Sequence, residues 1–99
     1  MQSHYPFAIE REMGCTEGEL RAWLPGASAG HTITWYAQGA DIELDQGCVS
    51  IRWHALVPRR IALIVLPRLA VHFDAKGVDE AAWQRFMRHF DLHTQRGGG

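Results

Sequence analysis

Apolar and polar positions alternate with a period of two along much of the chain, and this alternation predicts β-strands. Phe7, Ile9 and Met13 alternate with more polar neighbours up to Gly14, so the first strand is expected just before that glycine. Five more segments have the composition and spacing of strands, over residues 33–36, 40–44, 49–53, 60–66 and 69–74.

Two glycines predict how the central strands pair. If Gln38-Gly39 and Gln46-Gly47 are two-residue hairpin turns, with glycine supplying a positive φ, the register follows by counting. One face then becomes apolar across three strands and the other face polar, with Asp41 directly opposite Arg52. A slip of one residue would exchange the two faces, so the pattern restricts the pairing strongly.

Two helices are expected, one after the first strand and one at the C-terminal end. Thr16-Glu17-Gly18-Glu19 has the form of a capping box, and Pro25-Gly26 is expected to end this short helix. Asp79 is a suitable N-cap for a longer helix that runs to about Thr94. The longer helix has a wide apolar stripe formed by Trp83, Phe86, Met87 and Phe90.

These elements predict an α+β fold. We expect an antiparallel sheet of about six strands, with a short helix after the first strand and a long C-terminal helix packed on one face. Residues 1–95 are expected to form a single domain, followed by a flexible tail over residues 96–99.

This order of elements resembles the helix-grip fold of START-like lipid-transfer proteins and polyketide-cyclase-like proteins. The resemblance covers nearly the whole chain in topology and implies a ligand pocket between the helix and the sheet. Members of those families are longer and have additional elements beside the first helix. The segment His89-Phe90-Asp91-Leu92 and the final glycines, Gly97 to Gly99, also resemble the C-terminal region of a family of short bacterial proteins with no known activity.

Composition restricts the classes of partner. The 99 residues are 46% hydrophobic and 21% charged, as in ordinary globular domains. A net charge of −1 provides no overall field that would attract nucleic acid, so a nucleic-acid partner is not expected. The longest apolar run, Ile61 to Leu66, is too short to span a bilayer, so no membrane association is expected. We predict a cytoplasmic protein in which Cys15 and Cys48 are reduced thiols.

Motifs that identify an enzyme are missing from the sequence. There is no nucleophile elbow, phosphate-binding loop, dinucleotide fingerprint or zinc-protease signature, so we expect neither an enzyme nor a cofactor. His89 and His93 have a spacing that suits a metal, but cationic histidines near a helix C-terminus are also favoured by the helix dipole, and we expect no metal. Cys15 precedes a helix N-terminus, a position that can lower the pKa of a thiol.

Two surfaces could carry a function. Ile61, Leu63 and Val65 form an apolar outer face in the segment 60–66, with Arg68 at its rim. Such a face either pairs two subunits, docks another protein, or is covered by the first helix or the N-terminal segment. Our first hypothesis is therefore a non-enzymatic accessory or protein-interaction domain, either as a homodimer or with a different protein.

The alternative hypothesis is a protein that binds a small apolar or amphipathic molecule in a helix-grip-like pocket. Its candidate residues combine aromatic side chains with arginines at the pocket mouth, and they are Arg52, Trp53, Arg60, Trp83 and Phe86. The competing explanation for the aromatic residues is that they form the hydrophobic core, as a domain of this size requires.

Overall fold

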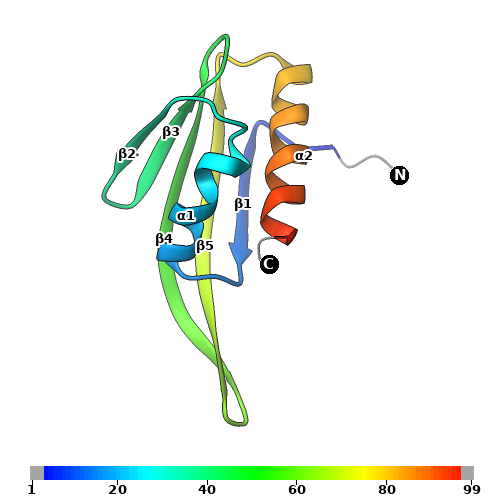
Figure 1. Ribbon diagram of the computed structural model, residues 1–99. Helices are drawn as coiled ribbons and strands as arrows, with labels where there is room; N and C mark the ends of the chain where they lie inside the picture. The colour runs from blue at the N-terminus through cyan, green and yellow to red at the C-terminus, as the bar shows by residue number, and fades with distance from the viewer. Residues whose placement is uncertain (1–3, 97–99) are drawn as a thin grey trace.

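One antiparallel sheet of five strands and two helices make up the fold (Figure 1). The computed structural model describes residues 4–96. In chain order the elements are β1 (Ala8–Met13), α1 (Glu17–Ala27), β2 (Ile33–Tyr36), β3 (Gly39–Glu43), β4 (Cys48–Ile61), β5 (Ile64–Lys76) and α2 (Glu80–Arg96). The strand order across the sheet is β1-β5-β4-β3-β2, and the predicted α+β class with its two helices is confirmed.

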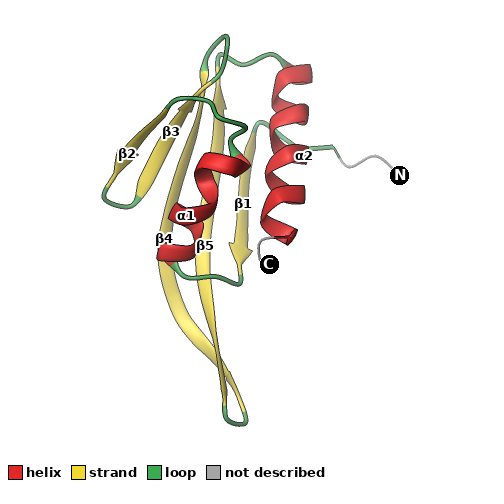
Figure 2. Ribbon diagram, viewed as in Figure 1, coloured by secondary structure: helices red, strands yellow, loops and turns green. Residues whose placement is uncertain are grey.

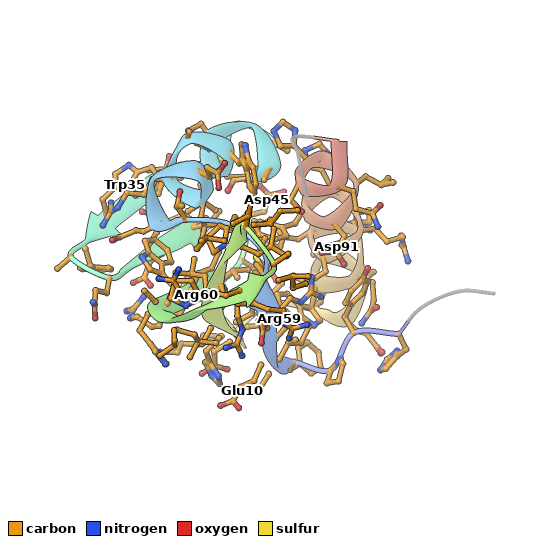
Figure 3. All side chains as sticks on the ribbon, turned by 90° about the horizontal axis from the view of Figure 1, so that it is seen from below. Glu10, Trp35, Asp45, Arg59, Arg60 and Asp91 are labelled. Atoms are coloured by element: carbon orange, nitrogen blue, oxygen red, sulfur yellow. The ribbon has the colours of Figure 1, made fainter. Side chains whose placement is uncertain are left out.

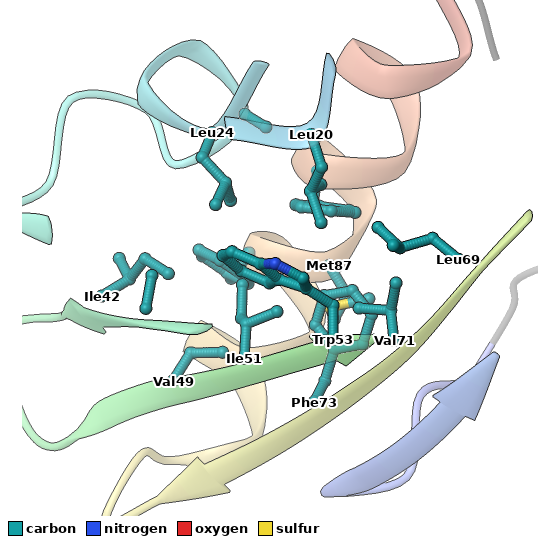
Figure 4. Close-up of a cluster of buried hydrophobic side chains, with 14 of the residues drawn as sticks. Leu20, Leu24, Ile42, Val49, Ile51, Trp53, Leu69, Val71, Phe73 and Met87 are labelled. Atoms are coloured by element: carbon teal, nitrogen blue, oxygen red, sulfur yellow. The ribbon is translucent and has the colours of Figure 1, made fainter. Parts of the chain in front are cut away.

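Both helices lie on the same face of the sheet (Figure 2), and the core fills the space between them and the strands. Leu20 and Leu24 of α1 point toward Trp53 and the strands beneath it (Figure 4). From α2, Trp83 and Phe90 are completely buried. Each such side chain contributes roughly 1.5–3 kcal/mol of transfer free energy, so this face of the sheet is where the fold gains most of its stability.

The helix starts follow the predicted capping. The Thr16 hydroxyl accepts a hydrogen bond from the Glu19 backbone N–H at 3.1 Å, and the Glu19 carboxylate accepts one from the Thr16 N–H at 2.9 Å. A carboxylate oxygen of Asp79 accepts the N–H of Ala82 at 2.8 Å and caps α2. The predicted end of α1 at Pro25-Gly26 is wrong by a residue or two, because the helix continues to Ala27.

The strand count is five, close to the expected six, because β4 and β5 are much longer than the sequence pattern indicated. Pro58 and Pro67, which lie between the expected strands and are typical turn residues, are inside β4 and β5. The chain reverses at Ala62-Leu63 instead, between the two strands. Prolines are tolerated at these places because β3 pairs with β4 only up to Arg52 and β1 pairs with β5 only from Leu69, so no third strand needs their missing N–H groups.

The predicted register of the central hairpins is wrong by two residues. Ile42 pairs with both Ile33 and Val49, and Asp41 lies opposite Ser50 rather than Arg52. A shift of two residues keeps every side chain on its predicted face, which is why the apolar and polar faces agree with expectation. The Asp41–Arg52 ion pair also forms, now diagonally across the strands at 3.2 Å.

No helix in the described range 4–96 is long and apolar enough to cross a membrane. Because α2 extends to Arg96, the expected tail begins inside that helix, and residues 97–99 lie outside the described part.

Candidate functional site

The most prominent surface feature is a hairpin arm, which we define as residues 57–66 at the joined ends of β4 and β5. It projects beyond both helices and beyond the rest of the sheet (Figure 2). Of the ten exposed large apolar side chains within residues 4–96, six lie on the arm. They are Val57, Ile61, Leu63, Ile64, Val65 and Leu66, and Leu63 at the turn is 99% exposed.

The arm presents apolar groups on both of its faces. Ile61 lies opposite Ile64 in the ladder, whereas Val65 lies opposite Arg60, one position further from the turn. Because neighbouring positions on a strand point to opposite faces, Ile61 and Val65 do not share a face as the sequence had suggested. The structure nevertheless gathers the three predicted interface residues, Ile61, Leu63 and Val65, at the exposed end of the arm.

Arg68 anchors the base of the arm to the body of the protein. Its guanidinium donates two hydrogen bonds of 2.9 Å to the carboxylate of Glu12 on β1, and a third of 3.0 Å to the Val57 carbonyl. The hydrogen bonds from Arg68 lower the pKa of Glu12 below its ordinary value. Arg68 therefore supports the base of the arm through hydrogen bonds to β1 and to Val57, and its place at the rim of an interface stays a prediction.

Charge is distributed unevenly between the hairpin and the rest of the molecule. Residues 46–73 contain four arginines and no acidic residue, so all eleven carboxylate side chains lie elsewhere in the chain. Arg52 and Arg68 form ion pairs with Asp41 and Glu12. Arg59 and Arg60 lie on the arm (Figure 3), and their guanidinium groups form no ion pair or hydrogen bond with any of residues 4–96.

A hollow lies near the base of the arm, mainly on the sheet face that the helices leave uncovered. It has a volume of about 620 Å³, with the small side chain of Ala70 between Glu12 and His54 on the adjacent strands. Glu10, which points away from the helices (Figure 3), borders it and approaches His72 at 3.4 Å. We call this feature the open-face hollow.

The five predicted ligand-binding residues are not brought together. Trp53, Trp83 and Phe86 are 3%, 0% and 7% exposed and belong to the core. Arg52 lies on the uncovered face, where its guanidinium is 4.8 Å from the centre of the Tyr36 ring, and Arg60 lies on the arm.

The indole N–H groups of the two buried tryptophans are used internally. Trp53 donates to the Glu17 carboxylate at 3.0 Å, which lowers the pKa of Glu17. Trp83 donates to the carbonyls of Tyr5 and Pro6, at 3.1 and 2.8 Å. These bonds satisfy polar groups that burial would otherwise leave unpaired, so both rings act as core residues with fixed orientations.

The two histidines of α2 contact the end of α1. The His89 ring nitrogen Nε2 lies 2.8 Å from the Gly26 carbonyl oxygen, and the His93 ring packs so closely that a Cβ on Gly26 would lie 2.5 Å from its Cε1. Within residues 4–96 no group of three or more histidine, cysteine or acidic side chains is arranged to hold a metal.

The two cysteines differ in environment, and we predict that they differ in reactivity. Cys15 is buried, and this burial, together with nearby Glu19, raises the pKa of its thiol, so the helix N-terminus does not activate it. A raised pKa leaves less thiolate at a given pH, so Cys15 should react with an aromatic disulfide reagent roughly tenfold or more slowly than half-buried Cys48.

Absorbance of the released thiolate at neutral pH measures both rates. Cys48→Ser should remove the fast phase and Cys15→Ser the slow one. A fast phase that disappears in Cys15→Ser would show that the assignment is reversed.

Sequence reasoning identified the apolar segment but not the arm. The signal that was available is the long stretch without an acidic residue between Asp45 and Asp74, which coincides with the projecting hairpin. No family model matches the chain, and neither a curated protein nor a solved structure matches it.

Proposed function

We propose that the protein is a non-enzymatic protein-interaction domain whose contact surface is the arm. The observation that carries this proposal is the exposure of six aliphatic side chains on one projecting hairpin, with Leu63 at its end. Isolated exposed apolar residues are normal on protein surfaces, but a contiguous group is a mark of an interface.

The size of the apolar surface supports this role. The six side chains are each between 42% and 99% exposed, and together they cover both faces and the turn of the arm. Arg59 and Arg60 lie beside the apolar residues, and their guanidinium groups form no ion pair or hydrogen bond within residues 4–96, as expected for the polar rim of an interface.

The small-molecule alternative has less support. The helix-grip resemblance places a ligand between the helices and the sheet, and in this chain that space is occupied by buried side chains such as Trp83, Phe73 and Phe90. The open-face hollow could accept a small molecule, but it lies mainly on the opposite side of the sheet. A cytoplasmic location remains part of the proposal and rests on the sequence.

Site-specific photocrosslinking tests the proposed role. A photoreactive benzoylphenylalanine in place of Leu63 should give discrete crosslinked protein species in cells that express the chain. The matched control carries the same group in place of Leu92, which is 56% exposed on α2 and lies outside the arm. Position 92 should give only background, because the arm makes the contact.

A second variant separates a specific contact from chance capture. Ile61→Glu, combined with the photoreactive group at position 63, places a charge on the arm at a residue that is 52% exposed and contributes little to the core. The crosslink should be lost while the thermal unfolding midpoint stays within a few degrees. Equal crosslinking from positions 63 and 92, or a crosslink that survives Ile61→Glu, would refute the interaction role.

A further inference from the structure

We propose that the partner of the arm is a second copy of this chain, and that each arm lies across the uncovered sheet face of the other copy with Leu63 in its open-face hollow. This inference rests on the proposed function of the arm, because it names the partner. The contact is reciprocal, so each copy supplies one arm and one hollow.

Charge complementarity favours a second copy. The hairpin 46–73 contains four arginines and no acidic residue. The arginines of the arm can therefore form ion pairs only with carboxylates outside this hairpin. The uncovered face of the sheet supplies them, because Glu10 and Glu12 lie on β1 beside the hollow, where Glu12 also pairs with Arg68 of its own chain. Glu10 has an 83% exposed side chain and lies 3.4 Å from the His72 ring, so its carboxylate is accessible to an arginine from another molecule.

The area argument points the same way. A stable dimer of standard size buries about 800 Å² on each partner. The face of the arm that would lie on the partner presents Ile61, Ile64 and Leu66, with Leu63 at the turn, and these side chains supply part of that area. In a reciprocal contact every copy contributes both an arm and a hollow, so the area buried on each copy is the sum of these two surfaces. A two-fold axis is also the commonest symmetry of homo-oligomers and needs the same patch on both copies.

The pairing of residues between neighbouring strands is compatible with such a contact. Suppose that a two-fold axis crosses the strands at right angles near the base of the arm. The two arms then point in opposite directions, and each arm lies over the sheet of the other copy. Counting along β5 from His72 and Ala70, Leu66 lies on the uncovered face, and so does Arg59, which is opposite Leu66. If Leu63 lies over the partner between Ala70 and His72, Arg59 falls at the level of the partner's residues 67–69. Glu12 is opposite Ala70 on the same face, so Arg59 approaches the partner's Glu12 across the axis.

Intermolecular disulfide formation tests this arrangement. Two variants, Leu63→Cys and Ala70→Cys, each also carry Cys48→Ser, and buried Cys15 is retained. The two purified proteins are mixed in equal amounts and oxidised, and the product is identified by non-reducing electrophoresis and by mass spectrometry of the joined peptides. The control replaces Ala70→Cys with Ala81→Cys, which offers an exposed position of the same residue type on α2.

We expect a covalent dimer that joins position 63 of one copy to position 70 of the other, formed at least roughly tenfold faster than the product with position 81. Sedimentation equilibrium of the unmodified protein should give twice the mass of 11.2 kDa. These two results together support the proposal.

Three outcomes would overturn it in distinguishable ways. A dominant disulfide between two copies of position 63 would show that arms pair tip to tip. A monomer in sedimentation whose arm still crosslinks to a different protein would exclude the second copy and leave the interaction role standing. A monomer whose arm crosslinks to nothing would exclude both.

Discussion

Replacing Trp83 with alanine will lower the free energy of unfolding by about 3–5 kcal/mol. The ring is fully buried and stacks on Phe86 with centroids 6.2 Å apart, so its loss leaves a cavity that the rigid sheet fills poorly. Its N–H also satisfies the carbonyls of Tyr5 and Pro6, which would then need new partners. Urea or guanidinium unfolding followed by circular dichroism measures the change.

The matched control is Leu92→Ala on the same helix, where the side chain is 56% exposed. Its effect should stay within about 0.5 kcal/mol. If the free energy of unfolding of Trp83→Ala equals that of the native chain, the ring is not a core residue. That result would support the alternative that Trp83 belongs to a ligand pocket.

Gly47→Ala is expected to cost about 3 kcal/mol or more, because two separate penalties add. Gly47 has φ +81°, a left-handed conformation that costs a residue with a Cβ roughly 1–2 kcal/mol. A Cβ there would also clash with the Lys76 carbonyl oxygen and lie 2.5 Å from the Gly77 carbonyl carbon. Both contacts are with backbone, which cannot move aside without disturbing the β3–β4 loop or the end of β5.

Gly30→Ala separates the two penalties. Gly30 has φ +78°, close to that of Gly47, but a Cβ there would meet nothing within 4 Å. Its cost should therefore be only the conformational part, about 1–2 kcal/mol. Equal destabilisation by the two substitutions, measured by the same unfolding assay, would show that the close backbone approach at Gly47 is unimportant.

Period-two alternation made the faces of the sheet predictable even where the register was not. Ile42 and Val49 were placed on the buried face, and they are there, because a slip of two residues leaves the parity of every position unchanged. The helix starts were predictable for a different reason. Capping by Thr16 and Asp79 depends on neighbouring residues alone, so tertiary contacts do not alter it.

The arm could not be predicted because its turn has no turn signal. Ala62 adopts φ 54° at the reversal, a conformation for which glycine or asparagine is the usual choice. Pro58 and Pro67, by contrast, are strong turn signals, but they lie in β4 and β5 at positions where neither β3 nor β1 pairs with these strands any longer. The sequence therefore indicates which residues form the apolar surface, namely Leu63 and its neighbours. That these residues project as an arm depends on where β1 and β3 end, which the sequence pattern does not show.

The two prolines have a consequence for how far self-association can proceed. Each lies in a strand of the arm whose outer edge has no neighbour, and each removes one N–H from the hydrogen-bonding groups there. The irregular pairing between Leu56 and Arg59 further disturbs the β4 side. An arm interrupted in this way is a poor template for strand-by-strand growth, so its apolar residues can make a side-on contact without seeding a continuous intermolecular sheet. We therefore expect the two prolines to disfavour the growth of fibrils through the arm.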